Sequence, residues 1–86
     1  EEAVHAPPGA RVLASGDLVT VDVGVELGGW FGDVAECVLL EGGDEQSRKL
    51  VQTGRRAVAR AVRACRPGVW WSEVARVVRA ATGRAA

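Results

Sequence analysis

The sequence predicts an α+β fold in which an N-terminal loop leads into an antiparallel β-hairpin and two α-helices follow. The main observation is a change in hydrophobic spacing, from a period of two within residues 18–40 to steps of three and four after residue 44. Glycine and proline clusters also separate the segments. With 86 residues and 9.0 kDa, the chain is expected to be one small domain or a part of a larger one.

Residues 1–17 are expected to form a loop, and residues 18–40 a hairpin. The loop contains Pro7-Pro8-Gly9 and a second breaker cluster just before the first strand. The first strand alternates β-branched residues with polar or small ones: Val19, Val21, Val23 and Val25. Gly28-Gly29 predicts the hairpin turn, because glycine accepts the positive φ of tight turns. A second strand then follows, over residues 30–40.

Residues 44–66 predict a long amphipathic helix and residues 72–82 a shorter one. Asp44 is a suitable N-cap for the first helix, and Arg66-Pro67-Gly68 is expected to end it. Ser72 is the predicted N-cap of the second helix, which Gly83 ends. Arginines occupy most positions outside the apolar stripe of the long helix.

The composition is that of an ordinary folded protein, with 48% hydrophobic and 26% charged residues. No apolar run approaches the ~18–20 residues that span a bilayer, so no membrane role is expected. The first residues show no signal-peptide pattern, which favours a cytoplasmic location. Cys37 and Cys65 lack metal-ligand spacing and are expected to be reduced thiols, although a single disulfide between them stays open.

The net charge of zero conceals a strong asymmetry along the chain. Residues 1–47 contain ten acids and one base, whereas residues 48–86 contain ten bases and one acid. A basic half can bind nucleic acid, but no aromatic residues interleave with these arginines as a stacking platform would need. A solvated or ion-paired helix face is therefore the preferred interpretation, and no nucleic-acid partner is expected.

Asp22 and Asp33 are the most informative pair of residues in the sequence. Opposite residues in an antiparallel hairpin have a constant index sum, which is 55 or 57 here depending on the exact turn. In either register both carboxylates leave the same face, where they would repel each other unless a divalent cation lay between them. The alternative is that Asp22 decorates a polar face and Asp33 caps a bulge at Gly32.

The runs Ser15–Gly24 and Gly29–Asp33 resemble the metal-binding hairpin of type I methionine aminopeptidases, members of peptidase family M24. Residues 45–68 resemble the next helix and turn of that family. Upstream, the segment Val4-His5-Ala6-Pro7-Pro8 stands where the family has its catalytic histidine loop. The resemblance implies that residues 1–86 form part of a single pita-bread metallopeptidase catalytic domain.

The resemblance also implies roles for three residues. Asp22 would hold one of two divalent metal ions (Co, Mn, Fe or Zn), and Asp33 would bridge both. His5 would hydrogen-bond the substrate and stabilise the tetrahedral intermediate. The enzyme would then be a hydrolase that removes N-terminal methionine from nascent proteins through metal-activated water, in the cytoplasm and near the ribosome.

Other interpretations stay open. The family's remaining histidine and two glutamate ligands have no counterpart in this chain, so the chain alone is expected to be inactive. An Xaa-Pro peptidase relative shares the two aspartates. A non-catalytic pita-bread module that binds proteins is slightly favoured by Val34 after Asp33 and by Ala6 after His5. Trp30 is expected to pack or to line a pocket rim, whereas Trp70-Trp71 fit either a docking surface or a core.

Overall fold

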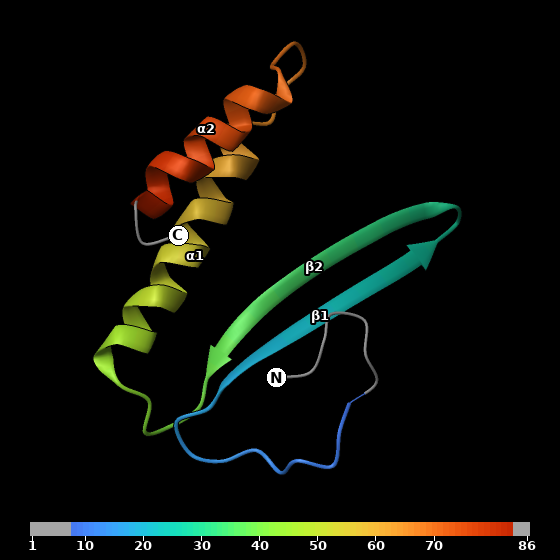
Figure 1. Cartoon of the computed structure of the whole chain (residues 1–86). Helices are drawn as coiled ribbons and strands as arrows, with labels where there is room; N and C mark the ends of the chain where they lie inside the picture. The colour runs from blue at the N-terminus through green and yellow to red at the C-terminus, as the bar shows by residue number, and fades with distance from the viewer. Residues whose placement is uncertain (1–7, 84–86) are drawn as a thin grey trace.

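The computed structural model describes residues 8–83, and it has the predicted α+β architecture. The elements follow in the order β1 (Leu18–Leu27), β2 (Trp30–Leu39), α1 (Glu45–Ala64) and α2 (Trp71–Thr82). The two strands form a long hairpin that projects away from the pair of helices (Figure 1). The predicted loop over residues 1–17 contains no helix or strand in its described part. His5 lies outside the described residues.

The hairpin is regular from end to end. Gly28 and Gly29 both have positive φ, 58° and 85°, as a two-residue turn of the primed type requires. Cα pairing then runs without interruption from Leu27 opposite Trp30 to Leu18 opposite Leu39. Gly32 pairs with Val25 in this ladder, so the alternative of a bulge at Gly32 is wrong.

Main-chain hydrogen bonds tie the loop before β1 to the segment after β2. The Gly16 amide donates to the Glu41 carbonyl at 2.8 Å, and the Leu40 amide donates to the Asp17 carbonyl at 2.9 Å. The Asp17 carboxylate accepts from the Ala14 amide at 2.8 Å and pairs with the Arg11 guanidinium at 3.0 Å. These hydrogen bonds hold the segment before β1 and the segment after β2 together at the open end of the hairpin.

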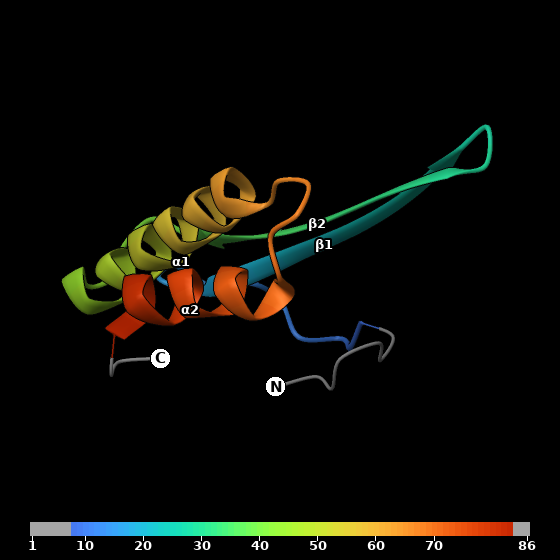
Figure 2. The same cartoon turned by 90° about the horizontal axis from the view of Figure 1, so that it is seen from above.

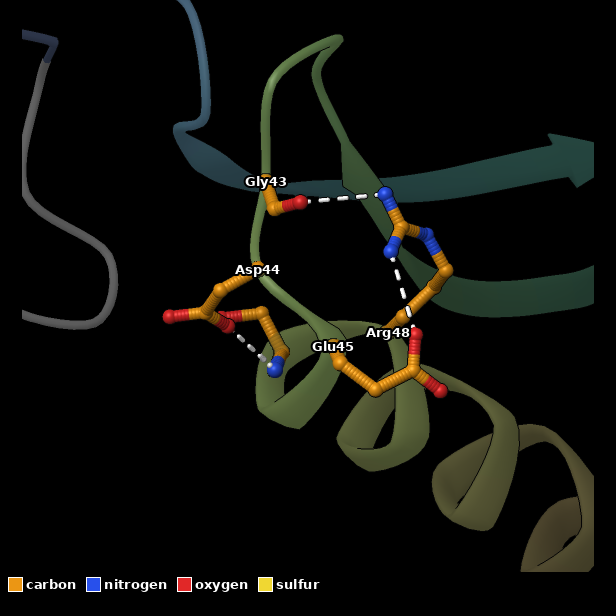
Figure 3. Close-up of polar contacts among 5 residues, drawn as sticks. Gly43, Asp44, Glu45 and Arg48 are labelled. Atoms are coloured by element: carbon orange, nitrogen blue, oxygen red, sulfur yellow. Dashed lines mark hydrogen bonds and ion pairs between the residues drawn. The ribbon is translucent and has the colours of Figure 1, made fainter.

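The start of α1 confirms the predicted cap. The Asp44 carboxylate accepts a hydrogen bond from the Ser47 amide at 2.7 Å, which satisfies one of the free N–H groups of the first turn (Figure 3). Arg48 reaches back to the Gly43 carbonyl at 3.0 Å and to the Glu45 carboxylate at 3.2 Å. The helix proper occupies Glu45–Ala64, slightly less than the 44–66 that the sequence suggested.

The start of α2 differs from the prediction. The N-cap is Trp70, whose side chain makes no capping bond, and Ser72 lies inside the helix. The Trp70 carbonyl accepts a hydrogen bond from the Glu73 amide at 2.9 Å, so the helix begins before Ser72. The turn at Gly68 (φ 88°) positions the backbone for this earlier start. The predicted cap at Ser72 is therefore wrong, whereas the predicted end at Gly83 (φ 63°) is confirmed.

The core is small and lies between the two helices, which pack side by side in both views (Figures 1 and 2). Ala57 on α1 and Val74 on α2 are the buried hydrophobic residues of the described chain. Helix α1 also lies beside β2, where the Arg55 guanidinium and the Glu36 carboxylate form an ion pair at 2.9 Å. Within residues 8–83, this ion pair links the acidic hairpin to the basic helices.

The three tryptophans lie outside this core. Trp30 at the hairpin turn is 84% exposed, and Trp70 and Trp71 at the start of α2 are about equally open to solvent. The interpretation that Trp70 and Trp71 pack in a core is therefore wrong for this chain. Trp30 neither packs against the helices nor lines the groove between α1 and β2.

Two further expectations can be compared with the described part of the chain. Cys37 and Cys65 are both free thiols, so the disulfide alternative is wrong. Within residues 8–83, neither helix has the length and hydrophobicity needed to cross a membrane.

Asp17, just before β1, and Asp44, at the start of α1, are expected to make the stability of the fold sensitive to acid. Hydrogen bonds from the Ala14 amide and Arg11 hold the pKa of Asp17 below its usual 3.8, and the bond from the Ser47 amide does the same for the pKa of Asp44. Because the folded-state pKa values are lowered, this stabilisation is complete above the unfolded value. It is lost as the pH falls through the folded values.

We therefore expect the thermal midpoint of the chain, followed by circular dichroism, to fall between about pH 6 and about pH 3. Asp17→Asn and Asp44→Asn keep a hydrogen-bond acceptor but do not titrate, so each should make that fall smaller. An unchanged fall in the double variant would show that these two carboxylates do not set the acid sensitivity.

Candidate metal centre

Asp22 and Asp33 project from the same face of the hairpin. Asp22 lies opposite Ala35 in the register, and Asp33 lies opposite Gly24. Opposite residues share a face, as do residues two apart on one strand, so the two aspartates are diagonal neighbours. This is the register with an index sum of 57, one of the two that the sequence allowed.

The residues at the other two corners of this block are small. Ala35 contributes one methyl group opposite Asp22, and Gly24 contributes no side chain opposite Asp33. A Cβ built on Gly24 would meet no atom within 4 Å. Diagonal neighbours are separated by about 7–8 Å between Cα atoms, so two carboxylates can turn toward a common point over this open corner.

The two aspartates are exposed and make no ion pair with a described residue. Carboxylate oxygens on a rigid scaffold are suitable ligands for divalent cations, and a bound cation would relieve their mutual repulsion. Two carboxylates beside free space have the donor chemistry that a divalent metal ion requires.

The rest of this face, which we call the carboxylate face, is mixed in character. Glu26 and Phe31 lie opposite each other toward the turn, and Thr20 and Cys37 lie opposite each other toward the open end. The Thr20 hydroxyl and the half-buried Cys37 thiol are 3.3 Å apart. This contact was not predicted from the sequence. The hairpin register with an index sum of 57 places Thr20 opposite Cys37, so the register could have predicted it.

The pair does not form a complete centre by itself. Within residues 8–83, no three histidine, cysteine, aspartate or glutamate side chains are grouped as metal ligands. The candidate catalytic residue His5 lies outside the described residues. The described chain therefore brings together two of the three residues that the sequence singled out.

An apolar groove lies next to this site, between β2 and α1. Its sheet side includes Thr20, Ala35 and Cys37 of the carboxylate face, and its helix side includes Leu50 and Val58. Ala35 belongs to both features, so the groove begins beside the aspartate pair. The sequence alone did not predict it, because it depends on how α1 lies against the hairpin.

Comparison with known proteins identifies the family of this chain. Residues 1–85 match metallopeptidase family M24. The chain is 34% identical over 84 residues to the methionine aminopeptidase of Treponema pallidum, covering 98% of this chain and 33% of the relative. It is 30% identical over 78 residues to methionine aminopeptidase 1 of Bacillus subtilis, covering 91% of this chain and 32% of the relative.

A mitochondrial relative shows higher identity over a shorter stretch. The mitochondrial methionine aminopeptidase 1D of Danio rerio is 41% identical over 64 residues, covering 74% of this chain and 19% of the relative. The chain thus spans about a third or less of the length of these curated relatives. Since the family match extends over nearly all of its residues, the chain belongs to metallopeptidase family M24.

Proposed function

We propose that this chain is part of the pita-bread catalytic domain of a metallo-aminopeptidase that removes methionine from the N-termini of proteins. The observation that carries the proposal is the diagonal placement of Asp22 and Asp33 over the open corner at Gly24. The family match supports a metal-dependent peptidase, and the three relatives described above are named as methionine aminopeptidases. These names favour methionine over an Xaa-Pro substrate.

In this proposal, Asp22 would hold one divalent ion and Asp33 would be a ligand shared by two. The ions, which would be Co, Mn, Fe or Zn, would activate the water that hydrolyses the peptide bond. The hairpin's contribution is rigid orientation, because uninterrupted pairing on both sides of Asp22 and Asp33 fixes the two backbones. His5 would hydrogen-bond the substrate.

In this proposal the remaining ligands come from outside residues 8–83, because within these residues two carboxylates leave most positions of a metal site unfilled. The non-catalytic alternative drew on Val34, where the family usually has a hydroxyl. In the register Val34 lies opposite Val23, on the other face from Asp33. That geometry weakens the case for Val34 as a sign of lost function.

The proposed substrate is the N-terminal peptide of newly made proteins, and the proposed setting is the cytoplasm close to the ribosome. Free thiols at Cys37 and Cys65 are compatible with a reducing compartment.

A chimera tests the proposal directly. This chain would replace the matching third of the Treponema pallidum methionine aminopeptidase, to which it is similar over 98% of its length. We expect the purified chimera, supplied with Mn²⁺ or Co²⁺, to release methionine from a Met-Ala-Ser peptide and to lose that activity when the metal is chelated. A folded chimera that binds Mn²⁺ but releases no methionine would contradict the proposal and would favour a non-catalytic module.

A further inference from the structure

Helix α1 carries a row of bases on one side, which we call the basic stripe: Lys49, Arg56, Arg60 and Arg63. Their spacings of seven, four and three residues place them within about 60° around the helix axis and over about 21 Å of its length. All four residues are exposed. From Gln46 to Ala64 the helix contains no acid, so no carboxylate of its own interrupts the row.

The ion pairs of α1 involve other residues. Arg55 pairs with Glu36 of β2 at 2.9 Å, and Arg48 pairs with Glu45 at 3.2 Å. Within residues 8–83, the four residues of the basic stripe make no ion pair. The sequence alone favoured a solvated or ion-paired face with no nucleic-acid partner. In the described part of the chain, ion pairing does not account for this side of α1.

The apolar residues of α1 lie on its other sides. Val51 and Val58 line the groove against β2, and Ala57 is buried in the core shared with α2. More of an M24 polypeptide can cover such surfaces by burying apolar groups. Covering the basic stripe in the same way would take four charges out of water without partners, which is strongly unfavourable. The stripe is therefore expected to face water or an anionic partner.

The chemistry of the basic stripe fits phosphate better than other anionic groups. Three of its four bases are arginines, whose planar guanidinium groups bind two phosphate oxygens at once. No apolar residue lies among the four, whereas a protein interface has an apolar core and a membrane-surface helix has a free apolar side. No aromatic residue lies there to stack unpaired bases, so a duplex is favoured over a single strand. A duplex offers about twelve negative charges over about 21 Å.

We propose that the basic stripe binds the phosphate backbone of a double-stranded nucleic acid. The four bases would neutralise phosphates without reading base edges, so RNA and DNA duplexes of any sequence are expected to bind with similar affinity. This proposal is independent of the proposed enzymatic function, because the stripe lies on α1 and not on the carboxylate face of the hairpin.

Fluorescence anisotropy of labelled duplexes of about 20 base pairs tests the proposal with the purified 86-residue chain. Four phosphate contacts predict a slope of about −3.6 in log K against log salt, so binding should weaken about a hundredfold between about 0.05 M and about 0.2 M. Arg56→Gln/Arg60→Gln should halve that slope. Arg48→Gln/Arg55→Gln is the matched control, because it removes equal charge from the same helix outside the stripe, and it should keep the slope. Circular dichroism establishes that each variant is folded.

The chimera with the Treponema pallidum enzyme should bind the same duplexes with the same dependence on Arg56 and Arg60. A chimera that lacks this dependence would show that the rest of an M24 domain covers the stripe, and it would overturn the proposal. Equal losses in the two double variants would assign binding to net charge. Displacement of the duplex by an equal charge of polyglutamate would identify an acidic protein as the partner. Either result, a preference for single strands, or no binding by the folded chain at about 0.05 M salt would also overturn the proposal.

Discussion

Asp22→Asn and Asp33→Asn are each expected to lower the kcat/KM of the chimera for methionine release by about a thousand-fold or more. Each change replaces a charged oxygen ligand with a neutral amide on the face where the two aspartates are diagonal neighbours. Asp33 is expected to have the larger effect, since the proposal gives it contact with both ions. The measurement is the initial rate of methionine release with excess Mn²⁺ or Co²⁺.

The matched control is Glu26→Gln, which removes one negative charge from the same face while leaving the aspartate pair intact. We expect less than about a tenfold change, because an exposed charge near the hairpin turn acts only through screened electrostatics. Equal losses in all three variants would show that overall negative charge, and not a ligand pair, matters. Full activity of either aspartate variant would remove that residue from the proposed metal site.

The 86-residue chain alone is expected to release no methionine from a Met-Ala-Ser peptide above background, with or without added Mn²⁺ or Co²⁺. The described residues supply two carboxylates and no third ligand. Both aspartates are also open to solvent, whereas peptide hydrolysis needs fixed ligands around an open coordination position and an enclosed substrate. We therefore expect methionine release from the chimera and none above background from the chain alone.

Chromatography of the released amino acid provides the assay, with the chimera at the same concentration as the positive control. Metal-dependent release that Asp33→Asn abolishes would contradict this expectation, and it would show that the chain completes a site by itself or by association.

The sequence was sufficient to predict the hairpin because its signals are local. Valine alternation selects a strand, and Gly28-Gly29 selects a two-residue turn through its positive φ. The same logic predicted the first helix, where Asp44 is both a good acceptor and correctly placed before the amphipathic pattern.

The start of α2 could not be predicted in the same way. Ser72 has the preferred chemistry of an N-cap, but the turn at Gly68 sets where the backbone becomes helical, and it does so before Ser72 is reached. Backbone geometry outweighed side-chain preference at that position. Trp70 therefore occupies the cap without providing a side-chain bond.

For the candidate site, the sequence predicted the shared face but not its surroundings. Either register placed Asp22 and Asp33 on one side, because side chains alternate with a period of exactly two. Only the actual register shows that the two small residues Gly24 and Ala35 fill the other corners. The groove beside Ala35 depends on tertiary packing of α1, which no local pattern encodes.

Titration of the ¹⁵N-labelled chain with Mn²⁺, followed by NMR, tests the central claim most directly, because it needs neither activity nor the missing ligands. Paramagnetic broadening is expected to be strongest at the amides of Gly24 and Ala35, beside the two aspartates, and to disappear in Asp22→Asn and in Asp33→Asn but not in Glu26→Gln. Broadening centred elsewhere, or unchanged in both aspartate variants, would contradict the claim that these two carboxylates hold a divalent cation together.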